Sequence, residues 1–258
     1  MSLLNFQVRG QGQPLVLIHG LFGSLDNLGM VAKPMAEHYQ VINVDVCNHG
    51  TSMHRPDMDY SLLAQDVIAV LDHLKIKQAN FLGHSMGGKI AMQVAQSFSE
   101  YVNKLIVADI APIAYPAHHQ EIIHGLQHVA TQLANGQVTT RRQADDVLSA
   151  YVETLGVRQF LLRNLTTTDG KLHFKCHLDN IAKCYPQIMQ ALDPHQTFNG
   201  DTLFIKGGAS NYITAEHSDI IKTMFPNSRA KIISGAGHWL HAEKTVAFNK
   251  IVKDFLNR

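Results

Sequence analysis

The sequence predicts an α/β fold with a mostly parallel central sheet, flanking helices and an inserted helical cap. Short, almost continuously apolar segments alternate with amphipathic segments of helical period along much of the 258 residues, which favours parallel strands joined by helices. The alternation stops between about residues 114 and 200, where the chain is rich in His, Gln and Thr. We therefore expect a core formed by residues 1–113 and 201–258, with residues 114–200 as the cap.

The expected strands are short and end at polar or glycine-rich segments. A strand at residues 4–9 precedes Gly10-Gln11-Gly12-Gln13-Pro14, a tight reversal typical of an antiparallel hairpin at a sheet edge. The parallel core strands are expected at residues 15–18, 41–45, 80–82, 105–109, 203–205 and 231–233.

The helices expected between these strands have one apolar face each. Residues 61–75 begin at Ser61, a residue type that caps helix N-termini. Residues 86–98 begin directly after Ser85, so the first amides of this helix face the serine. The last helix spans about 243–256 and carries its inward residues at Val246, Ile251, Val252 and Phe255.

The inserted segment is predominantly helical in pattern, with stretches near 118–134, 139–154 and 156–164. It lies between the strand that ends at Asp109 and the strand that starts at Thr202. Ligands of open α/β sheets bind at the carboxyl ends of the strands, so we expect the insertion to cover that edge.

Composition restricts the classes of partner. With 22 Lys+Arg against 21 Asp+Glu, the formal charge of +1 gives no basic field for nucleic acid. No apolar run approaches the ~20 residues that span a bilayer, so membrane insertion is not expected. Three cysteines and an N-terminus without a secretory pattern favour the cytoplasm. We expect a monomer or small homo-oligomer.

No metal or organic cofactor is expected. The histidines include no H-E-x-x-H arrangement. Four potential ligands lie close together in sequence but lack paired zinc spacing: His173, Cys176, His177 and Cys184.

Ser85 is the candidate nucleophile, in the segment Gly83-His84-Ser85-Met86-Gly87. A Gly-x-Ser-x-Gly turn between a strand and a helix exposes the serine hydroxyl on a sharp elbow. A serine needs a base within hydrogen-bond reach, and His238 supplies one, in a glycine-rich loop after the last strand. We expect His241 to be a surface or supporting residue.

Two backbone amides must stabilise the oxyanion of an acyl-transfer intermediate. One is expected from Met86, the residue after the serine. The loop after the strand at 15–18 offers the second, from either Leu21 or Phe22, while His19 is interpreted as a turn-stabilising side chain.

Several segments resemble the α/β-hydrolase superfamily and, within it, the YbfF-type bacterial esterases. They are HGLFGSLDNLG (19–29), GHSMGGK (83–89), DIAP (109–112) and GAGHWLHAEK (235–244). The resemblance implies an esterase of α/β-hydrolase fold without cofactor. The chain departs from many relatives at Cys47, where they have arginine, which concerns the stability of that loop more than the chemistry.

The resemblance also locates a missing acid. Most superfamily members carry the triad aspartate after the penultimate strand, but Ser210 stands there in this chain. Asp109 ends the strand that follows the nucleophile's strand, and the DIAP motif of YbfF-type esterases implies that it orients His238. Glu216 is the second candidate acid, and Asp45 is interpreted as bracing its own loop.

The function that we expect is a serine carboxylesterase acting through a Ser-His-Asp triad and an acyl-enzyme on short- to medium-chain esters. Coenzyme A thioesters stay open, because Arg141, Arg142, Arg158 and Arg163 are available to an anionic substrate. Its partner is then a small-molecule ester or thioester. The pocket is expected to include Phe22, Phe160, Leu161, Leu162 and Trp239.

Three alternatives share the fold. They are a carbon-carbon bond hydrolase, a menaquinone-pathway lyase and a non-catalytic ligand-binding relative. The lyases carry their acid where this chain has Ser210, which counts against that alternative.

Overall fold

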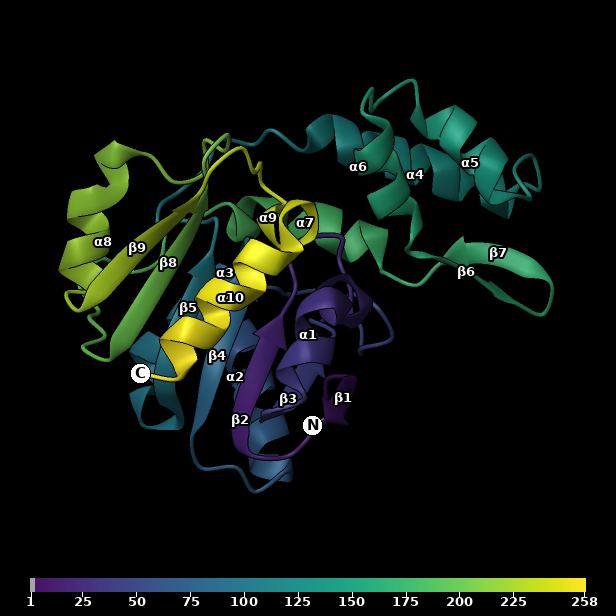
Figure 1. Cartoon of the computed structure of the whole chain (residues 1–258). Coiled ribbons are helices and arrows are strands. Elements are labelled where there is room, and N and C mark those ends of the chain that lie inside the picture. Colours follow the sequence, from purple (N-terminus) through teal and green to yellow (C-terminus); the bar gives the residue numbers. More distant parts are fainter. Residues whose placement is uncertain (1–2) are drawn as a thin grey trace.

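The computed structural model describes residues 3–258 and contains a seven-stranded sheet in the order β1-β3-β2-β4-β5-β8-β9 (Figure 1). All neighbouring strands are parallel except β1 and β3. The predicted α/β fold with a mostly parallel sheet is therefore confirmed. The strands are β1 (Phe6–Arg9), β2 (Gln13–Ile18), β3 (Tyr39–Val44), β4 (Ala79–His84), β5 (Val102–Ala108), β8 (Asp201–Gly207) and β9 (Ser228–Ile233).

The N-terminal strand is an antiparallel edge strand, but it pairs with β3 instead of forming the predicted hairpin with β2. The chain passes from β1 to β2 across the start of β3. A Cβ at Gly10 would lie 2.2 Å from the Ala36 carbonyl oxygen, and one at Gly12 would lie 2.7 Å from that of His38. Both glycines have positive φ, so they permit a close passage that local turn chemistry did not reveal.

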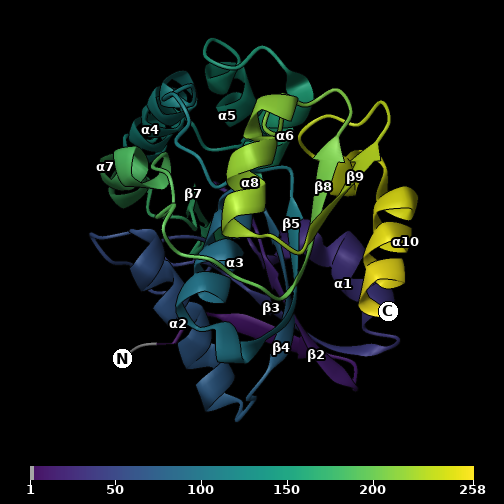
Figure 2. The ribbon, with the colours of Figure 1, turned by 90° about the vertical axis from the view of Figure 1, so that its left-hand side faces the viewer.

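Helices cover both faces of the sheet (Figure 2). Successive residues of a strand point to opposite faces, so Leu15 and Leu17 pack with one hydrophobic cluster while Val16 and Ile18 pack with the other. The first face is covered by α1 (Gly29–Met35) and α10 (Thr245–Leu256), and the second by α2 (Tyr60–His73), α3 (Met86–Ser97) and α8 (Ser218–Met224). Short helices are η1 (Leu25–Leu28), η2 (Ser99–Tyr101), η3 (Ala215–His217) and α9 (Leu240–Glu243).

Two expected details of the helices are wrong. The N-cap of α2 is Asp59, whose carboxylate accepts from the Leu62 amide at 2.9 Å, so Ser61 lies inside the helix. Val246 is 85% exposed, because the buried stripe of α10 runs through Phe248, Val252 and Phe255, at i, i+4 and i+7.

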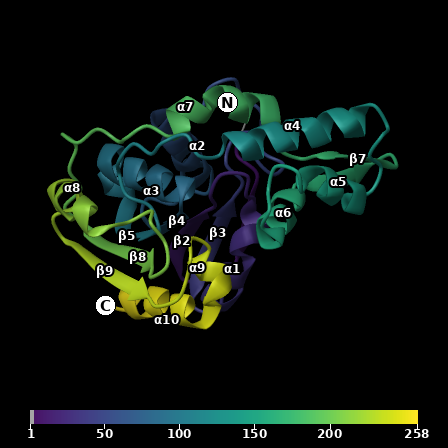
Figure 3. The same ribbon diagram turned by 90° about the horizontal axis from the view of Figure 1, so that it is seen from above.

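The inserted segment contains four helices and a two-stranded hairpin. They are α4 (Gln120–Ala134), α5 (Arg141–Leu148), α6 (Leu155–Leu162), β6 (Leu165–Thr168), β7 (Lys171–Phe174) and α7 (Leu178–Ile188). The hairpin was not expected, although Asp169 and Gly170 have the positive φ values of a tight hairpin turn and Asp-Gly signals such a turn. Figures 1 and 3 show these elements beyond the carboxyl ends of the parallel strands.

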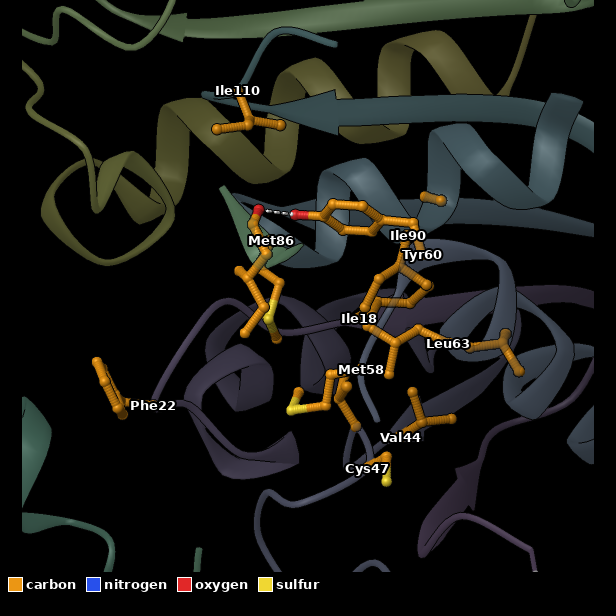
Figure 4. Close-up of a cluster of buried hydrophobic side chains, with 14 of the residues drawn as sticks. Ile18, Phe22, Val44, Cys47, Met58, Tyr60, Leu63, Met86, Ile90 and Ile110 are labelled. Carbon is orange, nitrogen blue, oxygen red and sulfur yellow. Dashed lines mark hydrogen bonds between the residues drawn. The ribbon is translucent and has the colours of Figure 1, made fainter. Parts of the chain in front are cut away.

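Hydrogen bonds tie the inserted segment to the core directly above the sheet edge. The Tyr60 hydroxyl donates to the Ile188 carbonyl at 2.6 Å, the bond drawn in Figure 4, and Asn164 Nδ2 donates to the Phe22 carbonyl at 2.6 Å. Figure 4 also shows Met86 directed into the buried cluster beneath this junction. The insertion therefore shares one hydrophobic cluster with the α2–α3 face of the sheet.

No helix in the described part of the chain is long and apolar enough to cross a membrane.

Candidate active site

Ser85 occupies a strained turn between β4 and α3. Its φ of +54° and ψ of −123° lie outside the regions that L-residues favour. The turn requires glycines on either side: a Cβ at Gly83 would lie 2.0 Å from the Gly87 carbonyl oxygen, and one at Gly87 would lie 2.2 Å from that of Ile18. The Ser85 amide donates to the Ala108 carbonyl at 2.9 Å, which anchors the turn to β5.

His238 lies within hydrogen-bond distance of this serine. Its Nε2 is 3.0 Å from Ser85 Oγ. The loop that carries it is held by His84, whose Nε2 donates to the His238 carbonyl at 2.8 Å. The Tyr212 ring stacks on the imidazole with a centroid distance of 3.8 Å and an interplanar angle of 17°. The position and plane of the imidazole are therefore both restrained.

Asp109 contacts the other nitrogen of the same imidazole. Its Oδ2 lies 2.8 Å from His238 Nδ1, and the residue is fully buried directly after β5. Gly207 N–H donates to Oδ1 at 2.9 Å, and the Ser210 hydroxyl donates to Oδ2. The structure thus brings Ser85, His238 and Asp109 into one hydrogen-bonded chain, with Ser210 as a donor to the carboxylate.

The other acidic residues considered lie in different surroundings. Glu216 is exposed in η3 and makes no hydrogen bond or ion pair with His238 within residues 3–258. Asp45 accepts from the Leu25 amide at 2.7 Å and from the Thr51 amide at 2.9 Å, so its carboxylate joins two loops.

Backbone amides flank the serine. Gly20 passes so close that a Cβ there would lie 3.1 Å from Ser85 Cβ. The Phe22 amide donates to His49 Nε2 at 3.1 Å. Among the described residues, the amides of Leu21 and Met86 donate to no acceptor, so these two N–H groups remain available.

His49 is a supporting residue that the sequence interpretation missed. Its Nδ1 donates to the Cys47 carbonyl at 2.9 Å, which leaves Nε2 as the acceptor for Phe22. Burial lowers the pKa of His49 to about 3, so the ring stays neutral near pH 7. His19 makes a similar bridge: Nδ1 donates to the Gly20 carbonyl and Nε2 accepts from the Val46 amide, and burial lowers its pKa.

Neutral histidines also surround His238. Burial holds the pKa of His84 well below its usual value. Burial lowers the pKa of His241 and of His119 to about 4 each. His241 is only 4% exposed, which excludes the surface position and leaves the other expected role, that of a supporting residue. Near neutral pH these neighbours therefore add no positive charge that would oppose an imidazolium at His238.

A cavity of about 240 Å³ opens beside Ser85 and His238. Four of the expected pocket residues line it: Phe22, Phe160, Leu161 and Trp239. Leu162 is not among the residues that line it. The lining residues that were not expected include Leu28 of η1, Ile122 of α4 and Val157 of α6, together with His119 and Tyr212 from loops.

Two of the four arginines considered for an anionic substrate are engaged elsewhere. Arg158 pairs with Asp145 at 2.8 Å, and Arg141 donates to the Leu162 and Leu165 carbonyls. Arg142 and Arg163 are exposed. Within residues 3–258, no group of three His, Cys, Asp or Glu side chains is arranged to hold a metal ion.

Comparison with known proteins shows which family the chain resembles. Residues 13–245 match the family described as alpha/beta hydrolase fold. The chain is 38% identical to esterase YbfF of Escherichia coli, covering 97% of this chain and 96% of that protein. It is 40% identical to a Haemophilus influenzae protein named putative esterase/lipase, covering 100% of this chain and 89% of the relative.

A solved structure titled marine microorganism esterase superposes on the chain with a TM-score of 0.94 at 35% identity, covering 99% of this chain and all of the other. The likeness therefore extends over the core and the inserted segment together. The chain belongs to the α/β-hydrolase fold family and, within it, to the YbfF-type esterases.

Proposed function

We propose that this chain hydrolyses short- to medium-chain carboxylic esters through a Ser85-His238-Asp109 triad and an acyl-enzyme. Membership of the YbfF-type esterases makes the chain a carboxylic-ester hydrolase. The observation that carries the mechanism is the unbroken chain of hydrogen bonds from Ser85 Oγ through the imidazole to a buried carboxylate.

In the first half-reaction, Ser85 Oγ attacks the ester carbonyl carbon while His238 Nε2 takes the hydroxyl proton. The negative charge that develops on the carbonyl oxygen is stabilised by the Leu21 and Met86 amides. The second amide is assigned to Leu21 because the Phe22 amide already donates to His49. His238 then returns the proton to the leaving alkoxide, and an acyl-Ser85 ester remains.

The second half-reaction uses the same groups with water. His238 Nε2 removes a proton from a water molecule that attacks the acyl carbonyl, and it then protonates Ser85 Oγ as the acid departs. Asp109 holds the Nδ1–H tautomer throughout and stabilises the imidazolium. Gly207 and Ser210 keep the carboxylate in position by donating to its two oxygens.

The proposal also covers the role of the inserted segment, the range of acyl substrates and the compartment. Residues 114–200 act as a cap that supplies apolar lining, including Phe160 from α6. Thioesters of coenzyme A require no change in the chemistry, since only the leaving atom differs. The three cysteines are free and buried, which fits a cytoplasmic enzyme.

Labelling of Ser85 by an organophosphate distinguishes this proposal from a non-catalytic binding protein. We expect one adduct per chain, located at Ser85 by mass spectrometry, and none in Ser85→Ala. Hydrolysis of p-nitrophenyl esters should be abolished in the same variant. An unlabelled wild-type chain, under conditions in which a control esterase reacts, would refute the nucleophile assignment.

A further inference from the structure

Ser85 lies between two cavities of very different size. The cavity of about 240 Å³ beside Ser85 and His238, lined by Phe22, Phe160 and Trp239, is called the large chamber. The small chamber has a volume of about 30 Å³ and lies on the side of α3, with a wall that includes Tyr60, Lys89, Ile110 and Met189. Leu21, Ser85, His119 and Tyr212 line both chambers.

Proton transfer decides which part of an ester enters each chamber. The leaving oxygen receives its proton from His238 Nε2, so it must lie within hydrogen-bond reach of that atom. His238 lines the large chamber and not the small one, whereas Met86, with its available amide, lines the small one. The alcohol part of the substrate therefore extends into the large chamber and the acyl part into the small chamber.

Buried side chains form much of the wall of the small chamber, and two of them are held by hydrogen bonds. Tyr60, Ile110 and Lys89 are 6%, 4% and 1% exposed, respectively. Tyr60 donates to the Ile188 carbonyl at 2.6 Å, and Lys89 Nζ donates to the Gln190 carbonyl at 2.5 Å, so both fix the end of α7 over the chamber. The small chamber has about an eighth of the volume of the large chamber, so it favours a short acyl group such as acetyl.

The large chamber, by contrast, continues outward. A third cavity, of about 400 Å³, adjoins the large chamber. Both are lined by Asn27, Val157, Phe160, Trp239 and His241. The Phe160 and Trp239 rings lie 5.7 Å apart at the boundary and give this route an apolar surface. A long apolar alcohol thus has more space on its side of Ser85 than a long acyl chain has on the other side.

From this asymmetry we propose that the preferred substrates are short-chain acyl esters of longer apolar alcohols, with the acyl group in the small chamber and the alcohol in the large chamber. The proposal rests on the proposed function and narrows it. The length of the acyl group is limited by the small chamber, whereas the large chamber accepts a longer alcohol.

Isomeric esters test this directly, because they have the same atoms and differ only in the direction of the ester group. Initial rates of acid release are measured by pH-stat titration for hexyl acetate and ethyl hexanoate, and for octyl acetate and ethyl octanoate. We expect kcat/KM to be at least about tenfold higher for the acetate of each pair, since one methylene that a pocket cannot accommodate already costs about tenfold or more.

Replacement of a residue that lines the small chamber tests whether that chamber causes the preference for short acyl groups. Met189 is only partly buried, so Met189→Ala should enlarge that chamber without loss of the fold. We expect it to raise kcat/KM for ethyl hexanoate about tenfold and to change that for hexyl acetate by less than about threefold. Met53→Ala is the matched control, a partly buried methionine that lines neither chamber, and should leave the ratio unchanged.

The possible outcomes separate this inference from the proposed function. If the acyl-lengthened isomers react as fast as the acetates or faster, the chamber assignment is wrong while the esterase function stands. The assignment also fails if Met189→Ala and Met53→Ala shift the ratio equally. If neither isomer series is hydrolysed and Ser85 is not labelled, the proposed function fails and the assignment with it.

Discussion

Replacement of Asp109 by asparagine probes the most unusual element of the site, an acid placed after β5 rather than after β8. Asparagine has nearly the same shape and no charge. The Asp109 carboxylate accepts three donors: Gly207 N–H, the Ser210 hydroxyl and His238 Nδ1–H. The amide of asparagine has only one oxygen, so it cannot accept both from Gly207 on one side and from Ser210 and His238 on the other.

Either orientation of the amide in Asp109→Asn disrupts the site. If its oxygen accepts from Gly207, the NH2 group faces His238, Nδ1 must become an acceptor, and Nε2–H then donates to Ser85 instead of accepting its proton. If its oxygen faces His238, the NH2 group opposes the Gly207 N–H in a fully buried position. The first orientation leaves no buried donor unpaired at Gly207, and we expect it to dominate.

The loss of tautomer control should lower kcat on the order of 10⁴-fold, about 5 kcal/mol in activation free energy. The assay is steady-state hydrolysis of p-nitrophenyl acetate near pH 7, with unfolding measured by denaturant to confirm that the variant is folded. Glu216→Gln is the control, an exposed acid outside the hydrogen-bonded chain, and should retain wild-type turnover. Full turnover in folded Asp109→Asn, or loss of turnover in Glu216→Gln, would refute the acid assignment.

Three further predictions follow from individual contacts. Ser210→Ala removes one of three donors to the triad carboxylate, and we expect kcat to fall about tenfold, as for the loss of one hydrogen bond of about 1.4 kcal/mol, with KM for a p-nitrophenyl ester nearly unchanged. Gly87→Ala would place a Cβ 2.2 Å from a backbone carbonyl oxygen of β2, and we expect a loss of about 3 kcal/mol in unfolding free energy or no folded protein by circular dichroism. Burial lowers the folded-state pKa of His49 to about 3 and of His241 to about 4. Below the unfolded histidine pKa of about 6.5, the unfolded chain therefore binds more protons than the folded chain, and the free energy of unfolding falls as the pH drops from 6.5 towards 4. Denaturant titrations at pH 7 and pH 5 should show this loss, and His241→Gln should reduce its slope; an unchanged slope would contradict the assignment of a buried neutral ring.

Much of the fold is readable from the sequence because strand and helix patterns depend on residues a few positions apart. Each predicted core strand overlaps a strand of the sheet. The Gly-x-Ser-x-Gly motif is also a local signal, although only Gly83 is required by backbone of the turn itself, whereas Gly87 is required by the Ile18 carbonyl oxygen of β2. His238 could be chosen among the 16 histidines because its loop follows the last strand.

Features that depend on distant segments escaped the sequence patterns. The pairing of β1 with β3 depends on the passage of Gly10 and Gly12 over a strand start about thirty positions further along the chain. The choice between the Leu21 and Phe22 amides depends on His49, and the burial of His241 depends on its packing against His84. Neither contact leaves a periodic signal in the chain.

The sequence by itself determined the alternation of strands and helices, the strained serine turn and the chemical types of the three residues in the hydrogen-bonded chain, because short-range sterics and hydrophobic period specify these. Only the tertiary structure decided how they meet. It set Asp109, 129 positions from His238, at 2.8 Å from the imidazole, and it placed Ser85 between a chamber of about 30 Å³ and one of about 240 Å³. Distances and volumes of this kind arise from the packing of segments remote in sequence, and close packing of those segments is what limits the space at the site.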